Sequence, residues 1–466
     1  MKKPIVKIAL AASLTFSAFG TQAVLAKPTK TEQSQPYKVF DHKIIHKINA
    51  DNIYKNIDYL AKVPRVAGTK EEYNAVQFIK KQFKSYGYDV EIQPFTFIGY
   101  TSPSSLELSV EGFTEKLNPS EFTYTPSGDV TGEIVLAGLG KKEELAGVDL
   151  TGKIALIKRG EISFGEKVLN AAAAGAAGVI IYNNEEGALN GTLGEASDHY
   201  VPTVALTKAE GEAVAAYVQN KAASASLKVE GAVTEERQSH NVIATKKPTN
   251  KKKANNDVIV VGAHHDSVEL APGANDDASG TATTLELARV LKNLPTDTEI
   301  RFITFGAEEL GLIGSQYYVD NLPESELNRI IANFNLDMVG SRDAGDLVMN
   351  TVDGKPNLVT ELAQASSKRL NGVPTPYAEG GRSDHVPFGE AGIPAALFIH
   401  EPVEPWYHTP EDTIDKISKE KLQDVAEIVG TAIYDRARFD HMGPKDKKVK
   451  VKKEKNKELY HNKSIK

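Results

Sequence analysis

Hydrophobic residues recur along the second half of the chain in a pattern typical of alternating strands and helices. Short apolar runs predict strands at residues 258–263, 299–305, 330–336 and 395–399. Apolar residues at three- and four-residue spacings predict helices at 281–294, 358–370 and 421–436. This alternation predicts an α/β fold in which a mostly parallel mixed sheet carries helices on both faces.

The N-terminal part of the chain has a different pattern. Ahead of Asn52 we expect an unstructured stretch. From Asn52 to Tyr86, apolar residues at helical spacing predict two helices, which Pro64 and Gly68 separate. Alternating residues at 90–95 then predict a strand.

Between residues 102 and 240 the pattern changes to short strands and turns around an alanine-rich helix. Strand-like runs occupy residues 152–160, 178–183 and 201–206, and the helix is expected at 166–174. This segment resembles the protease-associated domain that is inserted in several peptidase families. It could restrict access, bind substrate or bind another protein. We therefore expect one domain built from residues 40–101 and 241–440, with 102–240 inserted as an α+β, β-rich domain.

The two ends of the chain have distinctive compositions: an apolar run after a charged start at the N-terminus, and a lysine-rich segment at the C-terminus. Met1-Lys2-Lys3, the apolar run after it and Ala26 predict a secretory signal peptide over residues 1–26, and hence a secreted, extracellular protein. The apolar run is shorter than the roughly 20 residues of a membrane-spanning helix, and no later segment is apolar enough to span. Residues 441–466 form a lysine-rich tail that we expect to be disordered, with contact to the cell wall as a second interpretation.

Composition limits the chemistry that the protein can use. The sequence contains no cysteine, so an exported form has no disulfides and any metal is bound through His, Asp or Glu. The net charge is -7 although the tail is strongly basic, so the body of the protein is acidic. An acidic body argues against nucleic acid as the main partner.

Five potential metal ligands follow the predicted strands of the second half. They are His264 in VGAHHDS, Asp276 in PGANDDASG, Glu309 in FGAEELG, Asp337 in NFNLDMVG and His408 in WYHTPEDT. Because the carboxyl ends of parallel strands meet at one edge of a sheet, we expect these side chains to share a crevice. A lone histidine there is more often structural, but carboxylates this dense are usually solvated or bound to a cation. Two histidines and three acids suit two zinc ions, and other divalent ions with a preference for oxygen also fit.

Six motifs occur in the order that the M28 family of zinc aminopeptidases shows, and the chain resembles that family across residues 240–415. The motifs are VGAHHDS, PGANDDASG, GAEELGLIGS, NLDMVG, GRSDHVPF and WYHTPEDT. The resemblance implies that His264 and Asp337 hold one zinc and that Glu309 and His408 hold the other. It also implies that Asp276 bridges the two ions.

The resemblance implies further roles around this site. Glu308 would be the general base, Asp266 an orienting carboxylate, Tyr407 a donor to the oxyanion and Arg382 a contact to substrate. Packing within a loop is the alternative for Tyr407, and an ion pair with Asp384 is the alternative for Arg382.

The expected function is therefore a secreted aminopeptidase with two zinc ions that hydrolyses N-terminal residues from peptides with a free N-terminus. A zinc carboxypeptidase or dipeptidase of the same fold is the nearest alternative. A non-catalytic binding protein would be marked by lost ligands, whereas this chain has all five and Glu308.

Overall fold

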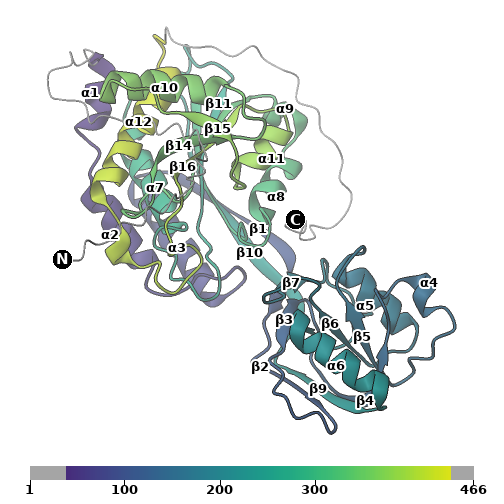
Figure 1. Ribbon diagram of the computed structural model, residues 1–466. Coiled ribbons are helices and arrows are strands. Elements are labelled where there is room, and N and C mark those ends of the chain that lie inside the picture. Colours follow the sequence, from purple (N-terminus) through teal and green to yellow (C-terminus); the bar gives the residue numbers. More distant parts are fainter. Residues whose placement is uncertain (1–37, 442–466) are drawn as a thin grey trace, which may run out of the picture.

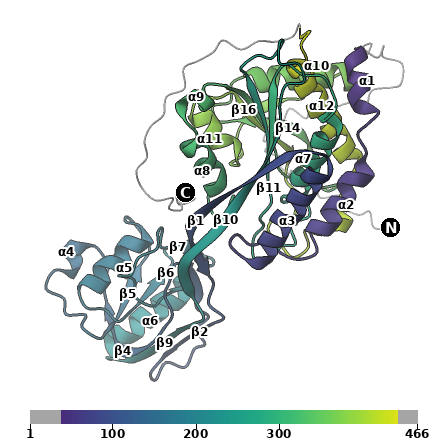
Figure 2. The same cartoon turned by 180° about the vertical axis from the view of Figure 1, so that it is seen from behind.

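Two long paired strands divide the molecule into a larger and a smaller unit (Figure 1). The computed structural model describes residues 38–441. Strands β1 (Asp89–Thr101) and β10 (Val233–Lys246) pair antiparallel over the whole length of β1 and carry the chain out of the larger unit and back. Figure 2 shows the same connection from behind. The predicted insertion at residues 102–240 starts directly after β1 and ends within β10.

The larger unit is built on an eight-stranded mixed sheet. In spatial order its strands are β1, β10, β12 (Glu299–Phe305), β11 (Val258–His264), β13 (Ile330–Leu336), β16 (Ala395–Glu401), β14 (Asp346–Thr351) and β15 (Tyr377–Glu379). The four central strands β12, β11, β13 and β16 are parallel, whereas β10 and β14 pair with them antiparallel. The predicted mostly parallel mixed sheet is confirmed.

Helices cover both faces of this sheet. One face packs against α1 (Val39–Ile45), α2 (Ala50–Leu60), α3 (Lys70–Ser85), α7 (Ala278–Leu291), α10 (Leu358–Asn371) and α12 (Lys419–Ala437). The other packs against α8 (Ile313–Asn321), α9 (Glu324–Leu327) and α11 (His385–Glu390). Strand β11 is apolar throughout because both of its faces are covered. Ile259 and Val261 face the first layer, and Val258 and Val260 face the second.

The expectation of an unstructured stretch before Asn52 is wrong from residue 38 onward, where the described residues begin. Helix α1 spans Val39–Ile45, and α2 begins at Ala50. Phe40 and Ile44, four residues apart, are buried in the core, and Arg369 forms an ion pair with Asp41 at 3.0 Å. A seven-residue helix is marginal alone, so these tertiary contacts stabilise it.

The smaller unit is α+β, as predicted, with its own sheet and its own apolar cores. Its strands, in spatial order, are β2 (Ser105–Val110), β9 (Ser224–Glu230), β4 (Gly128–Leu136), β5 (Ile154–Lys158), β6 (Gly178–Tyr182), β8 (Thr203–Leu206), β3 (Ser120–Thr123) and β7 (Gly191–Thr192). Helix α6 (Lys208–Asn220) covers one face, and α4 (Lys142–Leu145) and α5 (Phe164–Ala173) cover the other.

The predicted signal peptide and residues 442–466 of the lysine-rich tail lie outside the described residues. Between residues 38 and 441, no helix combines the length and the apolar character needed to cross a membrane.

We predict that Leu285→Ala lowers the free energy of unfolding of the larger unit by about 2–5 kcal/mol. Leu285 of α7 is fully buried between helix and sheet, so its truncation leaves a cavity. As a control in the same unit, Leu270→Ala removes a leucine that is 70% exposed, and we expect a change below about 1 kcal/mol. Denaturant unfolding followed by circular dichroism measures both, and equal losses would contradict the placement of Leu285 in the core.

Candidate metal centre

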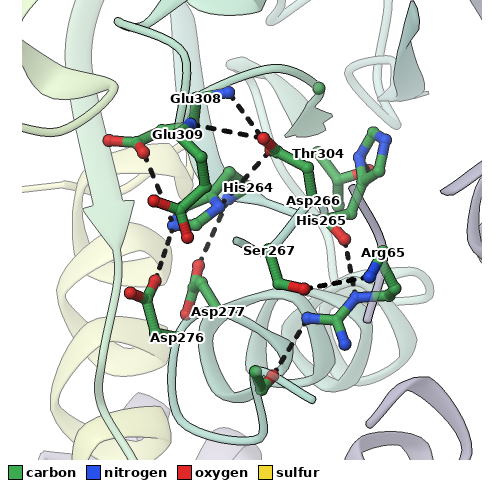
Figure 3. Close-up of polar contacts among 12 residues, drawn as sticks. Arg65, His264, His265, Asp266, Ser267, Asp276, Asp277, Thr304, Glu308 and Glu309 are labelled. Atoms are coloured by element: carbon green, nitrogen blue, oxygen red, sulfur yellow. Dashed lines mark hydrogen bonds and ion pairs between the residues drawn. The ribbon is translucent and has the colours of Figure 1, made fainter. Parts of the chain in front are cut away.

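The five predicted ligands converge at the carboxyl ends of the parallel strands. His264 ends β11, Asp337 directly follows β13 and Glu309 lies in the turn after β12. Asp276 precedes α7, and His408 comes from the loop after β16. Figure 3 shows His264, Asp276 and Glu309 pointing toward one another. The structure thus brings the five side chains together, and their roles as ligands stay a prediction.

Asp276 lies between the two histidines. Its Oδ1 is 3.2 Å from Nε2 of His264, and its Oδ2 is 3.1 Å from Nε2 of His408. Each imidazole also faces a second carboxylate: Asp337 Oδ1 is 3.5 Å from His264 Nε2, and Glu309 Oε2 is 3.1 Å from His408 Nε2. The donor atoms therefore form two sets. Each set has one imidazole nitrogen and one carboxylate oxygen of its own, and Asp276 contributes one oxygen to each.

These distances fit zinc. Two ligand atoms bound at about 2.0–2.1 Å in a tetrahedral arrangement lie about 3.3 Å apart. The four contacts above, at 3.1–3.5 Å, are close to that value. Asp337 Oδ1 and Glu309 Oε1 are also buried without a hydrogen-bond partner, as expected of oxygens whose partner is a cation. The donors are imidazole nitrogens and carboxylate oxygens, a set that zinc accepts.

Glu308 stands beside the first set of donors. Its Oε2 lies 4.0 Å from Nε2 of His264, the longest of the contacts to that imidazole. With His264 and Asp337 it forms a second cluster whose atoms could hold a metal. The side chain is buried, so its carboxylate faces the centre rather than open solvent.

Asp266 connects one histidine to both glutamates. Its Oδ1 accepts a hydrogen bond from the backbone N–H of Glu308 at 3.1 Å, and its Oδ2 accepts one from Glu309 at 3.2 Å (Figure 3). Oδ1 also lies 3.5 Å from Nδ1 of His264. A single fully buried carboxylate thus lies beside the imidazole and holds the turn that carries both glutamates, and its role in orienting the ligands stays a prediction.

Asp277 is a positioning residue to which sequence reasoning assigned no role. Its Oδ2 accepts from the backbone N–H of His264, and its Oδ1 accepts from Gly280 and Met338. It caps the N-terminus of α7 while joining the ends of β11 and β13. A possible signal is its place directly before the helix, as an aspartate that precedes Ala278.

Crowding of carboxylates dominates the electrostatics of the centre. Burial raises the pKa of Glu308 well above its usual range, and neighbouring Asp384 and Asp337 raise it further. Burial and the adjacent Asp276 raise the pKa of Glu309 to about 7. For His408, burial alone would lower the pKa, but hydrogen bonds to Asp276 and Glu309 raise it to about 10. The side chains therefore favour positive charge at their centre.

The side chains of Tyr407 and Arg382 are both exposed, and of the two only Tyr407 contacts a residue of the centre. Tyr407 is 44% exposed, and its ring stacks on His408 with centroids 3.8 Å apart. Burial of the phenol and the nearby carboxylates raise its pKa, so it keeps its proton and can donate. Arg382 is exposed while Asp384 is fully buried, and the described residues show no ion pair between them.

Sequence reasoning also missed two buried residues that hold the Asp276 loop, Arg65 and Asp412. Asp412 lies inside the WYHTPEDT motif, so its proximity to His408 was a usable signal. Arg65 follows Pro64 in the break between two predicted helices, and nothing in its local sequence connects it with the site.

Each unit of the fold matches the model of a known protein family. Residues 241–433 match the model of peptidase family M28, and residues 119–214 match that of the PA domain. Aminopeptidase YwaD of Bacillus subtilis (strain 168) is 44% identical over 399 residues, which cover 83% of this chain and 84% of that protein. Leucine aminopeptidase 2 of Arthroderma otae is 33% identical over 385 residues, covering 76% of each.

Solved structures give the same result. An aminopeptidase from Aneurinibacillus sp. strain AM-1 has 57% sequence identity and a TM-score of 0.77, covering 89% of this chain and 98% of that chain. BSAP, a zinc aminopeptidase from Bacillus subtilis, has 40% identity and a TM-score of 0.67, covering 87% of this chain and 98% of that chain.

We predict that Asp276→Asn weakens zinc binding by more than about 100-fold. Both oxygens of Asp276 face a set of donor atoms, so the substitution removes a ligand oxygen. Loss of a residue that only hydrogen-bonds to a ligand already weakens metal affinity about 10–100-fold, so loss of a ligand should cost more. Competition with a chromogenic chelator measures the affinity. Asp353→Asn, at an exposed aspartate that pairs with Lys355, is the matched control and should bind zinc like the wild type. Equal affinities in the two variants would exclude Asp276 as a ligand.

Proposed function

The chain belongs to peptidase family M28 and is a zinc aminopeptidase, and from this premise we propose that it works with two zinc ions and a glutamate base. His264 and Asp337 would hold one ion, Glu309 and His408 the other, and Asp276 would bridge them. The observation that carries the proposal is the position of Asp276, whose two oxygens face two histidines that each have a further carboxylate. When bound, the ions supply the Lewis acidity that polarises a peptide carbonyl and makes water more acidic.

Glu308 moves the proton in this proposal. Its carboxylate takes a proton from water as the water oxygen bonds to the carbonyl carbon of the substrate. When the C–N bond breaks, Glu308 returns that proton to the leaving amine. Its support is geometric: the side chain is buried beside His264, and Asp266 holds its backbone N–H.

Tyr407 and the acidic surroundings would act on the substrate. The protonated phenol of Tyr407, beside His408, can donate to the oxygen on which negative charge develops. Arg382 is exposed and would contact substrate. The acidic side chains of the centre attract the free ammonium of a peptide, which restricts cleavage to the N-terminal residue.

We further propose that the protein is secreted. The charged start, the apolar run and Ala26 support a signal peptide, and the absence of cysteine is compatible with export. The lysine-rich tail would then contact an anionic cell wall through its ten lysines between residues 445 and 466.

We predict that Glu308→Gln lowers kcat about 10²- to 10⁴-fold with zinc content unchanged, because the amide cannot accept the proton from water. An aminoacyl chromogenic amide serves as the substrate, and zinc is measured on the same sample. Glu390→Gln replaces an exposed glutamate at the end of α11 and is expected to keep full activity. Near-normal turnover of Glu308→Gln would overturn the base assignment.

We also predict that a peptide with a free N-terminus is shortened one residue at a time from that end, whereas its N-acetylated form is resistant. Acetylation removes the ammonium that the acidic site would hold. Mass spectrometry of the products identifies the end that is cut. Cleavage of the blocked peptide from its C-terminus would instead support the carboxypeptidase alternative.

A further inference from the structure

Arg65 lies fully inside the protein, below the loop that carries Asp276. Only 1% of its surface is exposed. Its Nε donates to the carbonyl of His265 at 2.7 Å, and its Nη1 donates to the carbonyls of Leu60 at 2.9 Å and Pro272 at 2.6 Å. Its Nη2 donates to the carbonyl of Gly273 at 2.9 Å. One side chain thus joins the end of α2, the segment after His264 and the loop before Asp276.

The bonds of Arg65 go to backbone carbonyls, not to a carboxylate. Burial of a guanidinium is unfavourable and lowers its pKa, whereas the charges of nearby Asp266 and Asp412 raise it. The planar fork presents its donors in fixed directions, which lets it hold several carbonyls at once. Arg65 therefore adds a positive charge and a rigid spacer beneath an acidic centre.

Asp412 holds the same loop through the backbone N–H groups of the loop. Its Oδ1 accepts from the backbone N–H of Asn275 at 2.8 Å, and its Oδ2 accepts from that of Asp276 at 3.0 Å. Its own carbonyl accepts from Ala274 at 3.2 Å. Asp412 is 1% exposed and lies four residues after His408. It thereby connects the segment that carries His408 to the backbone of Asp276.

Gly273 shows how closely the loop fits between these two residues. Its φ is +64°, a conformation that favours glycine. A Cβ at this position would lie 2.3 Å from the carbonyl oxygen of Asp276 and 2.9 Å from Nη2 of Arg65. The turn is therefore packed against the guanidinium without room for a side chain.

We infer that Arg65 and Asp412 are positioning residues that hold the two ends of the loop of residues 272–276 and so set the place of the bridging carboxylate. Arg65 holds carbonyls at the start of the loop, and Asp412 holds amides at its end. The inference rests on the two-zinc function proposed above and adds to it residues from outside the ligand set. Arg65 also lies outside the segment that matches the M28 family model.

The experiment compares zinc affinity in the wild type, Arg65→Lys and Asp412→Asn by competition with a chelator. Lysine keeps the charge but loses the fork that reaches four carbonyls. Asparagine keeps one acceptor oxygen, and its amide group faces a backbone N–H that it cannot accept from. We expect zinc to bind about 10–100-fold more weakly in each variant.

Arg369→Lys is the matched control. Arg369 donates to Asp41 from Nε and Nη2, both at 3.0 Å, and it is largely buried on α10. Its replacement should lower the thermal stability of the metal-free protein and leave zinc affinity unchanged. Thermal unfolding of every metal-free variant, followed by circular dichroism, separates a loss of fold from a loss of metal affinity.

The outcomes separate this inference from the proposed function. Weaker zinc binding in Arg65→Lys and Asp412→Asn, but not in Arg369→Lys, supports positioning. Wild-type affinity in both variants overturns it, even if their stability falls. If one of the two variants does not fold, the other decides. A wild type that binds one zinc would contradict the two-zinc proposal, and the same comparison of affinities would still decide the positioning role.

Discussion

Repulsion among the carboxylates crowded around His264 and His408 governs how this centre is built. Asp276 and Asp337 are buried and Glu309 is partly buried, and each has an oxygen 3.1–3.5 Å from an imidazole nitrogen. Two like charges about 4 Å apart repel by about 4 kcal/mol at an effective dielectric constant near 20. A few such pairs approach the free energy of unfolding of a typical domain, which is about 5–15 kcal/mol. Two divalent cations would turn this repulsion into attraction.

The fold meets this constraint with backbone contacts made by side chains that are not ligands. Parallel strands deliver His264 and Asp337 to one edge of the sheet, but Asp276 and His408 come from loops that the sheet does not fix. Asp277 ties the ends of two strands to α7, and Asp412 ties the two loops together. The centre is therefore rigid where strands end and also where loops would otherwise move, a condition for holding a shared carboxylate between two ions.

Local sequence patterns predicted the elements whose stability is local or whose apolar faces are regular. The helices at 358–370 and 421–436 correspond to α10 and α12, since each presents a repeated apolar stripe to the sheet. Helix α1 was missed because its seven residues depend on partners more than 300 positions away, such as Arg369. In the site, the ligand candidates were found because they follow apolar strands. Arg65 was not, since its bonds go to backbone carbonyls of residues 5 to 208 positions away, and no motif encodes such contacts.

In the proposed mechanism the acidic cluster holds two zinc ions, with Asp276 between them. The most direct test is anomalous X-ray diffraction from crystals of the zinc-loaded protein, with data collected on both sides of the zinc absorption edge. The account predicts two peaks in the edge-difference map, one beside His264 and Asp337 and one beside Glu309 and His408, each within bonding distance of one oxygen of Asp276. A single peak, or zinc bound away from these side chains, would contradict it.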